Sequence, residues 1–303
     1  MSTHPLNWPD YREFKTAWVR DLCWLLDPSF DLSVPSSPYP AFAAGRDLTA
    51  IHWLETLDDS HCDLVTSPVT EQRENQRLGH YFEDLVAYYL QHCPSQSVKN
   101  LQRNVALRTP LEHGNGVNTL GELDFLYERD RQWHHLEVAV KFYLAVERRG
   151  ERIWLGPNCK DQLDIKWRRM LTHQLPLGQI AAPGQNVQSQ FWLKGLLFEP
   201  FSSLSDETEP TNRLHWVHLK DLPAYLHAFP GDWVRLKKLQ WLGADREPLP
   251  QNNHELFNAL QQHFTQKNFA IMLKNQNSKV EHRCFIVNNA WPEPTINILP
   301  ESL

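Results

Sequence analysis

The stretch 121–146, GELDFLYERDRQWHHLEVAVKFYLAV, decides the fold. Its first part, 121–127, and its last part, 133–146, alternate between polar and apolar residues, which is the pattern of β-strands with two different faces. The polar residues 128–132 between them indicate a turn. We therefore expect two antiparallel strands, each with one polar and one apolar face.

The polar faces of these two strands carry the residues of chemical interest. Alternation puts Asp124 on the polar face of the first strand, and Glu137 and Lys141 on one face of the second. Side chains directly opposite each other on paired strands lie within about 5 Å. Two carboxylates at that separation suit one hard divalent cation, Mg²⁺ or Mn²⁺, and a nearby lysine stabilises developing negative charge. The sequence thus predicts a catalytic group of Asp124, Glu137 and Lys141.

Helices are expected on both sides of the strands. The spacing of apolar residues predicts a long helix over 71–92 and another over 161–175, with a further strand over 100–108. In the first of these helices Glu83 has small or apolar neighbours on its own face, so a charge there needs a reason. We expect Glu83 to supply a third carboxylate to the cation.

The sequence patterns at the two ends of the chain predict two regions in addition to the core. Two amphipathic helices are expected near the N-terminus, over 13–26 and 48–57. The C-terminal part mixes both kinds of element: strands are expected over 190–198, 214–219, 233–241, 269–274 and 283–288, and helices over 221–228 and 253–266. The predicted organisation is an N-terminal helical cap over 1–66, a core over 67–190 and a mixed α/β extension over 191–303.

Composition and charge limit the class of protein. The 303 residues are 41% hydrophobic and 22% charged, as in a globular domain. The net charge of −6 arises within 1–66, which holds ten acidic and four basic residues, so the rest is balanced. The segment 141–169 has eight basic and four acidic residues, which favours either contact with a phosphate backbone or a solvated helix face. Without a long apolar run or a secretory signal, we expect a cytoplasmic protein that does not enter a membrane.

Four segments carry a family resemblance: LGHYFEDLVAYYL, GELDFLY, HLEVAVKFYL and GPNCKDQLDIKWRRMLTHQL. Their order resembles the PD-(D/E)XK nuclease superfamily, whose core is a helix, a three-stranded meander, a helix and a further strand. They also look like an uncharacterised bacterial domain-of-unknown-function family placed in that superfamily. The fold class that this implies is α/β (α+β), with a restriction endonuclease-like core.

The resemblance also implies roles for residues. Glu83 corresponds to the glutamate of the first core helix, Asp124 to the motif aspartate, Glu137 to the motif acid and Lys141 to the lysine. Asp161 and Gln162 look similar to supporting positions of the RecB-like branch of the superfamily.

The spacing of the lysine departs from the family pattern. In the family the lysine follows the acid by two residues, whereas Lys141 follows Glu137 by four, about 13 Å along an extended strand. Either Lys141 reaches back along the strand, or a bulge shortens this gap, or Lys160 or Lys166 substitutes for Lys141.

Two functions from different classes remain open. The first is a metal-dependent phosphodiesterase or nuclease acting on DNA or RNA, in which Glu137→Ala would leave the fold stable because two carboxylates no longer repel. The second is a catalytically inactive binding or scaffold protein with a nuclease fold, since each of these charges alone is more often a surface ion pair. A serine hydrolase finds no support without a G-x-S-x-G motif. His135 shares the face of Glu137, so a position in the site stays open for it, but an exposed strand histidine is the favoured interpretation.

Overall fold

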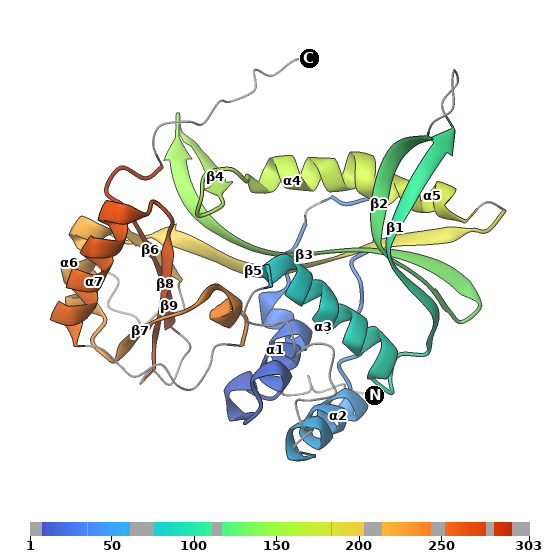
Figure 1. The fold of residues 1–303 in the computed structure, drawn as a ribbon, viewed down its shortest axis with the longest axis horizontal. Coiled ribbons are helices and arrows are strands. Elements are labelled where there is room, and N and C mark those ends of the chain that lie inside the picture. Colours follow the sequence, from blue (N-terminus) through green and yellow to red (C-terminus); the bar gives the residue numbers. More distant parts are fainter. Residues whose placement is uncertain are drawn as a thin grey trace. The chain divides into compact units, whose positions relative to one another are not determined.

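The computed structural model describes residues 8–292, apart from 35, 61–75, 111–116, 183, 203–213, 244–251 and 277–281. In these residues the chain forms a mixed α/β fold with a helical N-terminal region and a nine-stranded sheet (Figure 1), which confirms the expected α/β class. Within the same ranges, no helix has both the length and the apolar character needed to cross a membrane.

The helices are α1 (Ala17–Leu26), α2 (Leu48–Asp59), α3 (Leu78–His92), α4 (Leu163–Arg169), α5 (Gly178–Ala181), α6 (Leu222–Ala228) and α7 (Asn253–Gln266). The strands are β1 (Val98–Pro110), β2 (Val117–Arg129), β3 (Gln132–Arg148), β4 (Glu151–Leu155), β5 (Val187–Pro200), β6 (His215–His218), β7 (Trp233–Arg235), β8 (Ile271–Asn275) and β9 (His282–Val287). Their order in the sheet is β1-β2-β3-β5-β6-β9-β8-β7, with β4 paired to β3.

The chain divides into two compact units, each made of three segments. The first unit comprises Met1–Val140, Trp167–Gly195 and Leu242–Ala244, and the second comprises Lys141–Lys166, Leu196–Trp241 and Asp245–Leu303. The division crosses β3 and β5, so each of these strands contributes residues to both units. The domain boundaries expected at residues 66 and 190 stay a prediction.

Three helices pack together in the first unit. Helix α1 contacts both α2 and α3, and its residues are buried from Trp18 to Leu26 (Figure 1). Asp21 of α1 is fully buried and accepts hydrogen bonds from the Tyr81 hydroxyl of α3, at 2.5 Å, and from the backbone N–H of Gly243, at 2.8 Å. The helix expected over 71–92 begins at Leu78, and residues 71–75 of that prediction lie outside the described residues.

The first three strands form the expected antiparallel meander. Strands β1, β2 and β3 contain the predicted ranges and extend beyond them. Alternation on β2 is as expected from Glu122, which is exposed, to Leu123 and Phe125, which are buried, but it ends at Leu126, which is buried as well. Strand β5 runs in the same direction as β3, since Gln132 bonds to Asn186 and His135 to Ser189 with the same sequence separation of 54.

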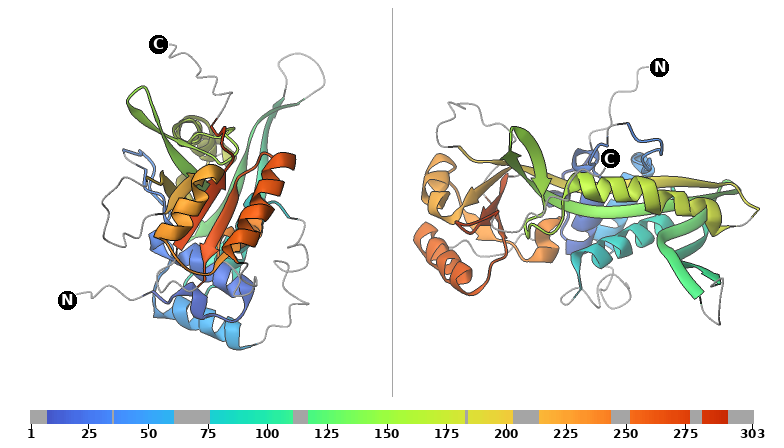
Figure 2. Two further views of the ribbon diagram at one scale, coloured as in Figure 1. Left: turned by 90° about the vertical axis from the view of Figure 1, so that its left-hand side faces the viewer. Right: turned by 90° about the horizontal axis from the view of Figure 1, so that it is seen from above.

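The helix expected over 161–175 is interrupted. Helix α4 ends at Arg169 and is followed by a π-helical turn, Met170–Gln174, a 3₁₀ turn, Leu175–Leu177, and then α5. Met170 and Leu175 of this segment are buried against β5, and Leu177 packs on the apolar cluster of β2. Residues 170–181 therefore cover one face of the strands of the first unit (Figure 2, right).

In the second unit, β4 is an element that the sequence patterning does not predict. It pairs with the end of β3, from Leu144 opposite Leu155 onward. The turn between them places Arg149 and Gly150 at positive φ, as two-residue hairpins require. Five residues with two exposed members give too short an alternation to identify as a strand.

Helices α6 and α7 share one side of the second unit's strands (Figure 2, left). The expected elements of this region are found, except that the strand predicted over 233–241 ends at Arg235 and gives way to a 3₁₀ turn at Lys238–Trp241. The apolar core between helices and strands consists of Val217, Leu219, Leu222, Tyr225, Leu226, Trp233, Leu256, Leu260, Ile271, Leu273, Cys284 and Ile286.

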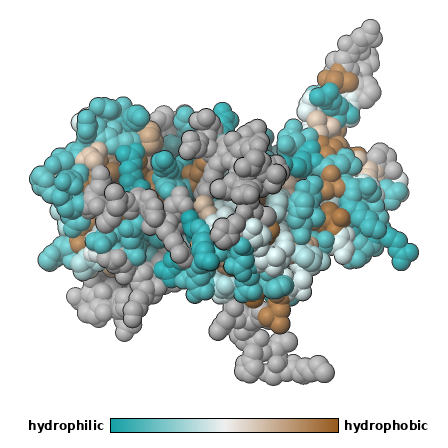
Figure 3. Space-filling view, turned by 60° about the horizontal axis from the view of Figure 1, so that its bottom comes forward, coloured by the Kyte–Doolittle hydropathy of each residue, from teal (hydrophilic) through white to brown (hydrophobic). Residues whose placement is uncertain are grey.

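Large apolar side chains that reach solvent are scattered. Among the described residues the exposed ones are Leu48, Val117, Leu120, Ile165, Ile180 and Phe269. On the face displayed in Figure 3, hydrophobic spots lie among mostly hydrophilic residues. Exposed apolar residues of this kind are normal on globular proteins and need no functional explanation.

A buried lysine ties the N-terminal region to β5 in the first unit. The ammonium group of Lys194 has no exposure, lies 2.8 Å from Oδ1 of Asp31 and donates to the carbonyl of Asp27 at 2.5 Å. Burial lowers the pKa of Lys194 from 10.5 to about 8, although Asp31 opposes this shift.

This shift predicts how stability depends on pH. The unfolded chain keeps the Lys194 proton up to its ordinary pKa, whereas the folded chain releases it near pH 8. The free energy of unfolding should therefore rise between about pH 8 and pH 10.5, by on the order of 3 kcal/mol. Urea unfolding at both ends of this window, for wild type and Lys194→Met, measures the effect. Equal pH dependence in the two proteins would contradict the assignment.

Candidate functional site

Asp124 lies where the pairing of β2 with β3 ends. The last paired residues are Phe125 and Leu136, and Asp124 and Glu137 are the next residues of the two strands, beyond the end of this pairing. At this point Oδ2 of Asp124 accepts the backbone N–H of Val138 at 2.8 Å, in place of a ladder bond between main chains. Asp124 is half-buried. The two acids predicted from the sequence thus lie on neighbouring strands, at the end of the ladder, where Asp124 bonds to the residue after Glu137.

Glu137 is held by two side chains. Its side chain has no exposure to solvent; Oε1 lies 2.8 Å from Nε2 of His135, and Oε2 accepts from the amide nitrogen of Gln174 at 2.6 Å. His135 comes from the same face of β3, and Gln174 comes from the end of the π-helical turn. Both oxygens of the carboxylate therefore already receive a hydrogen bond.

A chain of hydrogen bonds connects Glu137, through His135 and Ser189, to the carbonyl of Leu175. The Ser189 hydroxyl donates to the carbonyl of Leu175 at 2.7 Å, which uses its only proton. Nδ1 of His135, 3.2 Å from the same hydroxyl, is then the donor and Ser189 the acceptor. Nε2 of His135 and Oε1 of Glu137 share the next hydrogen bond of the chain, and both side chains are fully buried.

The structure corrects one expectation about this face. His135 is completely buried and not an exposed strand histidine. The cause is the segment 170–181, which covers this side of β3, and Gly178 at the start of α5 in particular. A Cβ atom at Gly178 would lie 2.8 Å from Nδ1 of His135 and 2.3 Å from Oγ of Ser189. Only a glycine allows the helix to approach so closely.

Glu83, the expected third carboxylate, lies on α3 and is partly exposed. Its carboxylate is 3.6 Å from Nδ1 of His80, one turn earlier in the helix. Burial raises the pKa of Glu83, and the nearby His80 opposes this shift. Within the described residues, no group of three or more His, Cys, Asp or Glu side chains is arranged to hold a metal ion. The role of Glu83 stays a prediction.

Lys141 belongs to the second unit, where it forms an ion pair. Its Nζ lies 2.5 Å from Oδ2 of Asp161, and both side chains are partly exposed. Tyr143, two residues along the same face of β3, is fully buried; burial and the nearby Asp161 carboxylate both raise the pKa of its hydroxyl. Lys141, the expected catalytic lysine, and Asp161, an expected supporting residue, are thus in direct contact.

The other supporting residues lie around the start of α4. Lys160 is exposed, and its backbone N–H donates to Oδ1 of Asn158. Gln162 forms a bridge with Leu155 of β4, and its carbonyl accepts the N–H of Lys166. These contacts fix the loop that carries Asp161; the catalytic roles proposed for Lys141, Lys160 and Lys166 stay predictions.

Sequence reasoning missed one member of the site, Gln174, and misjudged the burial of another, His135. Alternation along β3 placed His135 on the face of Glu137, but an exposed histidine was favoured. Gln174 had no such signal, because it is 37 residues from Glu137 and reaches it through a turn that departs from the 3.6-residue helical period.

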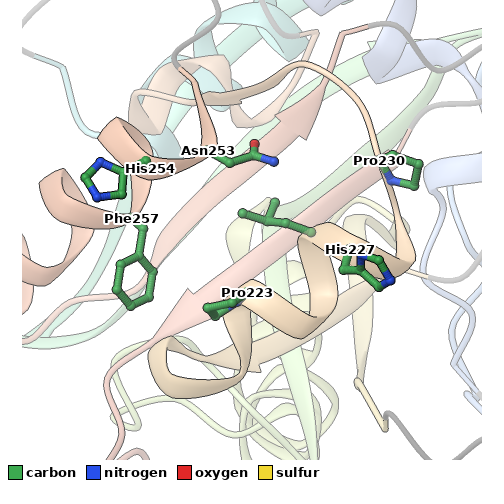
Figure 4. Close-up of a pocket in the computed structure, with 7 residues that line it drawn as sticks. Pro223, His227, Pro230, Asn253, His254 and Phe257 are labelled. Carbon is green, nitrogen blue, oxygen red and sulfur yellow. The ribbon is translucent and has the colours of Figure 1, made fainter.

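A pocket of about 510 Å³ lies in the second unit (Figure 4). Helix α6 contributes Leu226 and His227 to its walls, and α7 contributes Asn253, His254 and Phe257. None of the residues that line it is among those predicted from the sequence.

Comparison with known proteins identifies the family. A family model described as "Domain of unknown function (DUF1853)" matches residues 20–287, from within α1 to the end of β9. Neither a curated protein nor a solved structure matches the chain. Since the match covers most of the 303 residues, the chain belongs to the DUF1853 family.

Proposed function

We propose that this protein is a divalent-metal-dependent phosphodiesterase of the PD-(D/E)XK nuclease type, acting on nucleic acid. Support comes from the order of elements: helix α3, the meander β1–β2–β3, the helical segment 163–181, and then β5 running in the same direction as β3. This is the order of the core that the sequence resembles. A shared fold alone does not determine an activity, so the proposal depends on the site.

The observation that carries the proposal is that Asp124 accepts the backbone N–H of Val138, the residue next to Glu137, at the end of the β2–β3 pairing. The chemistry of the two carboxylates fits a hard cation, because Mg²⁺ is commonly bound by one or two carboxylates together with water and substrate phosphate. Each carboxylate oxygen of Glu137 accepts one hydrogen bond and has a second lone pair. Asp124 and Glu137 would hold the ion, with Glu83 as a further candidate ligand.

The side chains of the chain itself have distinct roles in this proposal. Asp124 and Glu137 provide negative charge, and the family resemblance implies for Lys141 the role of stabilising the charge that develops on the phosphate. A bound Mg²⁺ or Mn²⁺ would polarise the phosphate and lower the pKa of a water molecule.

Nucleic acid is the proposed substrate because of exposed basic residues. Arg168 and Arg169 are exposed at the end of α4, next to the turn that carries Gln174. Guanidinium groups bind phosphates of DNA or RNA independently of base sequence. Lys160, exposed before the same helix, adds to this basic segment.

The proposal predicts the effects of three substitutions on metal-dependent cleavage. Asp124→Asn and Glu137→Gln should each reduce cleavage by more than about 100-fold, because they remove a ligand charge with little change in shape. Lys141→Ala should lower turnover while metal binding is largely retained. The measurement is cleavage of labelled single- and double-stranded DNA and RNA with Mg²⁺ or Mn²⁺, together with calorimetric metal binding. Glu122→Gln, an exposed carboxylate on β2, is the matched control. Equal cleavage by wild type and Glu137→Gln would refute the proposal.

A second function, a nuclease-fold protein that binds nucleic acid without cleaving it, is favoured by one specific observation. Glu137 has no solvent exposure and is already paired with His135. This reading predicts no cleavage and no metal binding by wild type. It also predicts salt-dependent binding of nucleic acid that weakens in an Arg168→Glu, Arg169→Glu variant.

A further inference from the structure

The π-helical turn Met170–Gln174 is an unusual feature of the first unit. The N–H of Leu175 donates to the carbonyl of Met170, five residues earlier, where an α-helix would connect residues four apart. Turns of this kind are rare, and they are frequent at functional sites. A reason for this one should therefore be visible in its surroundings.

The wider turn lets two consecutive residues serve the same buried region. Gln174 donates through its side chain to Oε2 of Glu137 at 2.6 Å. Leu175 fills the apolar cluster with its side chain, and its carbonyl accepts the Ser189 hydroxyl at 2.7 Å. Neighbouring residues of a regular α-helix point about 100° apart, which makes such a shared orientation difficult.

The segment is fixed at its other end as well. Gly178 lies so close to Ser189 and His135 that any side chain would collide with them. Ser189 in turn contacts Nδ1 of His135, whose Nε2 lies 2.8 Å from Glu137. The π-helical turn and the start of α5 thus reach Glu137 by two routes, one through each carboxylate oxygen.

From this geometry we infer that Gln174 and His135 are positioning residues for Glu137. An N–H group at each oxygen fixes the rotation of the carboxylate plane, as outer groups do for the ligands of metal sites. The inference rests on the proposed function, because it assigns the held carboxylate to a cation. It adds that the π-helical turn exists to deliver the Gln174 amide.

The test is the affinity for Mn²⁺ alone, measured by calorimetry on the full chain. Gln174→Met keeps the length and flexibility of the side chain but removes the donor, and should weaken Mn²⁺ binding by about 10- to 100-fold. Gln179→Met, at an exposed position of α5, is the matched control and should leave the affinity unchanged. His135→Leu should also weaken binding, and His135→Gln, whose amide nitrogen can replace Nε2, should restore most of it.

Thermal unfolding without metal verifies that each variant is folded. Should Gln174→Met not fold, Gln174→Asn keeps the amide one methylene short of Glu137 and should weaken binding in the same way. Unchanged or tighter Mn²⁺ binding by a folded Gln174 variant would overturn the inference and leave the proposed function intact. Absence of Mn²⁺ binding by wild type would instead refute the proposed function, and the inference with it.

Discussion

Replacing Glu137 by alanine is expected to lower the free energy of unfolding by about 2 to 6 kcal/mol. The carboxylate is fully buried and forms a hydrogen bond with His135, which is also fully buried. Removing it leaves Nε2 of His135 without this partner, and the Gln174 amide loses its acceptor. The sequence alone predicts the opposite, a stable or slightly more stable variant, because it considers only the repulsion between Asp124 and Glu137. The buried hydrogen bonds of Glu137 therefore reverse the sign of the expected change in the free energy of unfolding.

Urea unfolding at neutral pH measures this effect. Glu137→Gln should lose much less stability than Glu137→Ala, because a glutamine retains the shape of the side chain and an oxygen that accepts from His135. Glu122→Ala, at an exposed position of β2, should stay within about 0.5 kcal/mol of wild type. A Glu137→Ala variant as stable as this control would contradict the buried hydrogen bonds of Glu137.

Asp21→Ala is expected to destabilise the first unit by about 2 to 6 kcal/mol. The carboxylate accepts from the Tyr81 hydroxyl and from the backbone N–H of Gly243, and it has no exposure. Its removal leaves two buried donors without this acceptor, and each unsatisfied donor costs about 1 to 3 kcal/mol. Tyr81→Phe removes only one of the two donors, so its effect should be smaller.

Thermal and urea unfolding of Asp21→Ala, Tyr81→Phe and the double variant form a cycle that isolates the bond between the two side chains. As a control, Glu55→Ala removes a carboxylate from an exposed position of α2 and should change little. A cycle with no coupling between Asp21 and Tyr81 would contradict the hydrogen bond.

The paired strands β2 and β3 were the part of the fold that the sequence predicted best. Alternation along 121–146 predicted β2 and β3, and it placed Asp124 and Glu137 on neighbouring strands. It did so because a strand has a fixed period of two, so that side chains alternate strictly between its faces. The burial of that polar face could not be predicted in the same way. Alternation predicts which residues share a face of the sheet, but it does not predict which segment of the chain covers that face.

The helical segment over that face departs from what apolar spacing alone predicts. Apolar spacing over 161–175 predicted one regular helix, whereas the chain changes to a π-helical turn at Met170 and so brings Gln174 to Glu137. Interruptions of this kind come from tertiary contacts, which a period of 3.6 residues does not encode. Lys141 shows a similar limit. Its spacing from Glu137 was recognised as unusual, and its pairing with Asp161 depends on the loop before α4.

The interleaved segments of the two units limit how the gene can be duplicated or divided. Residues 167–195 and 242–244 of the first unit stand between pieces of the second, and β3 and β5 supply residues to both. A contiguous stretch of gene that encodes one unit alone does not exist. Duplication, fusion or loss of a gene fragment would therefore carry both units or damage both, so we expect them to be present together in any protein that has this arrangement.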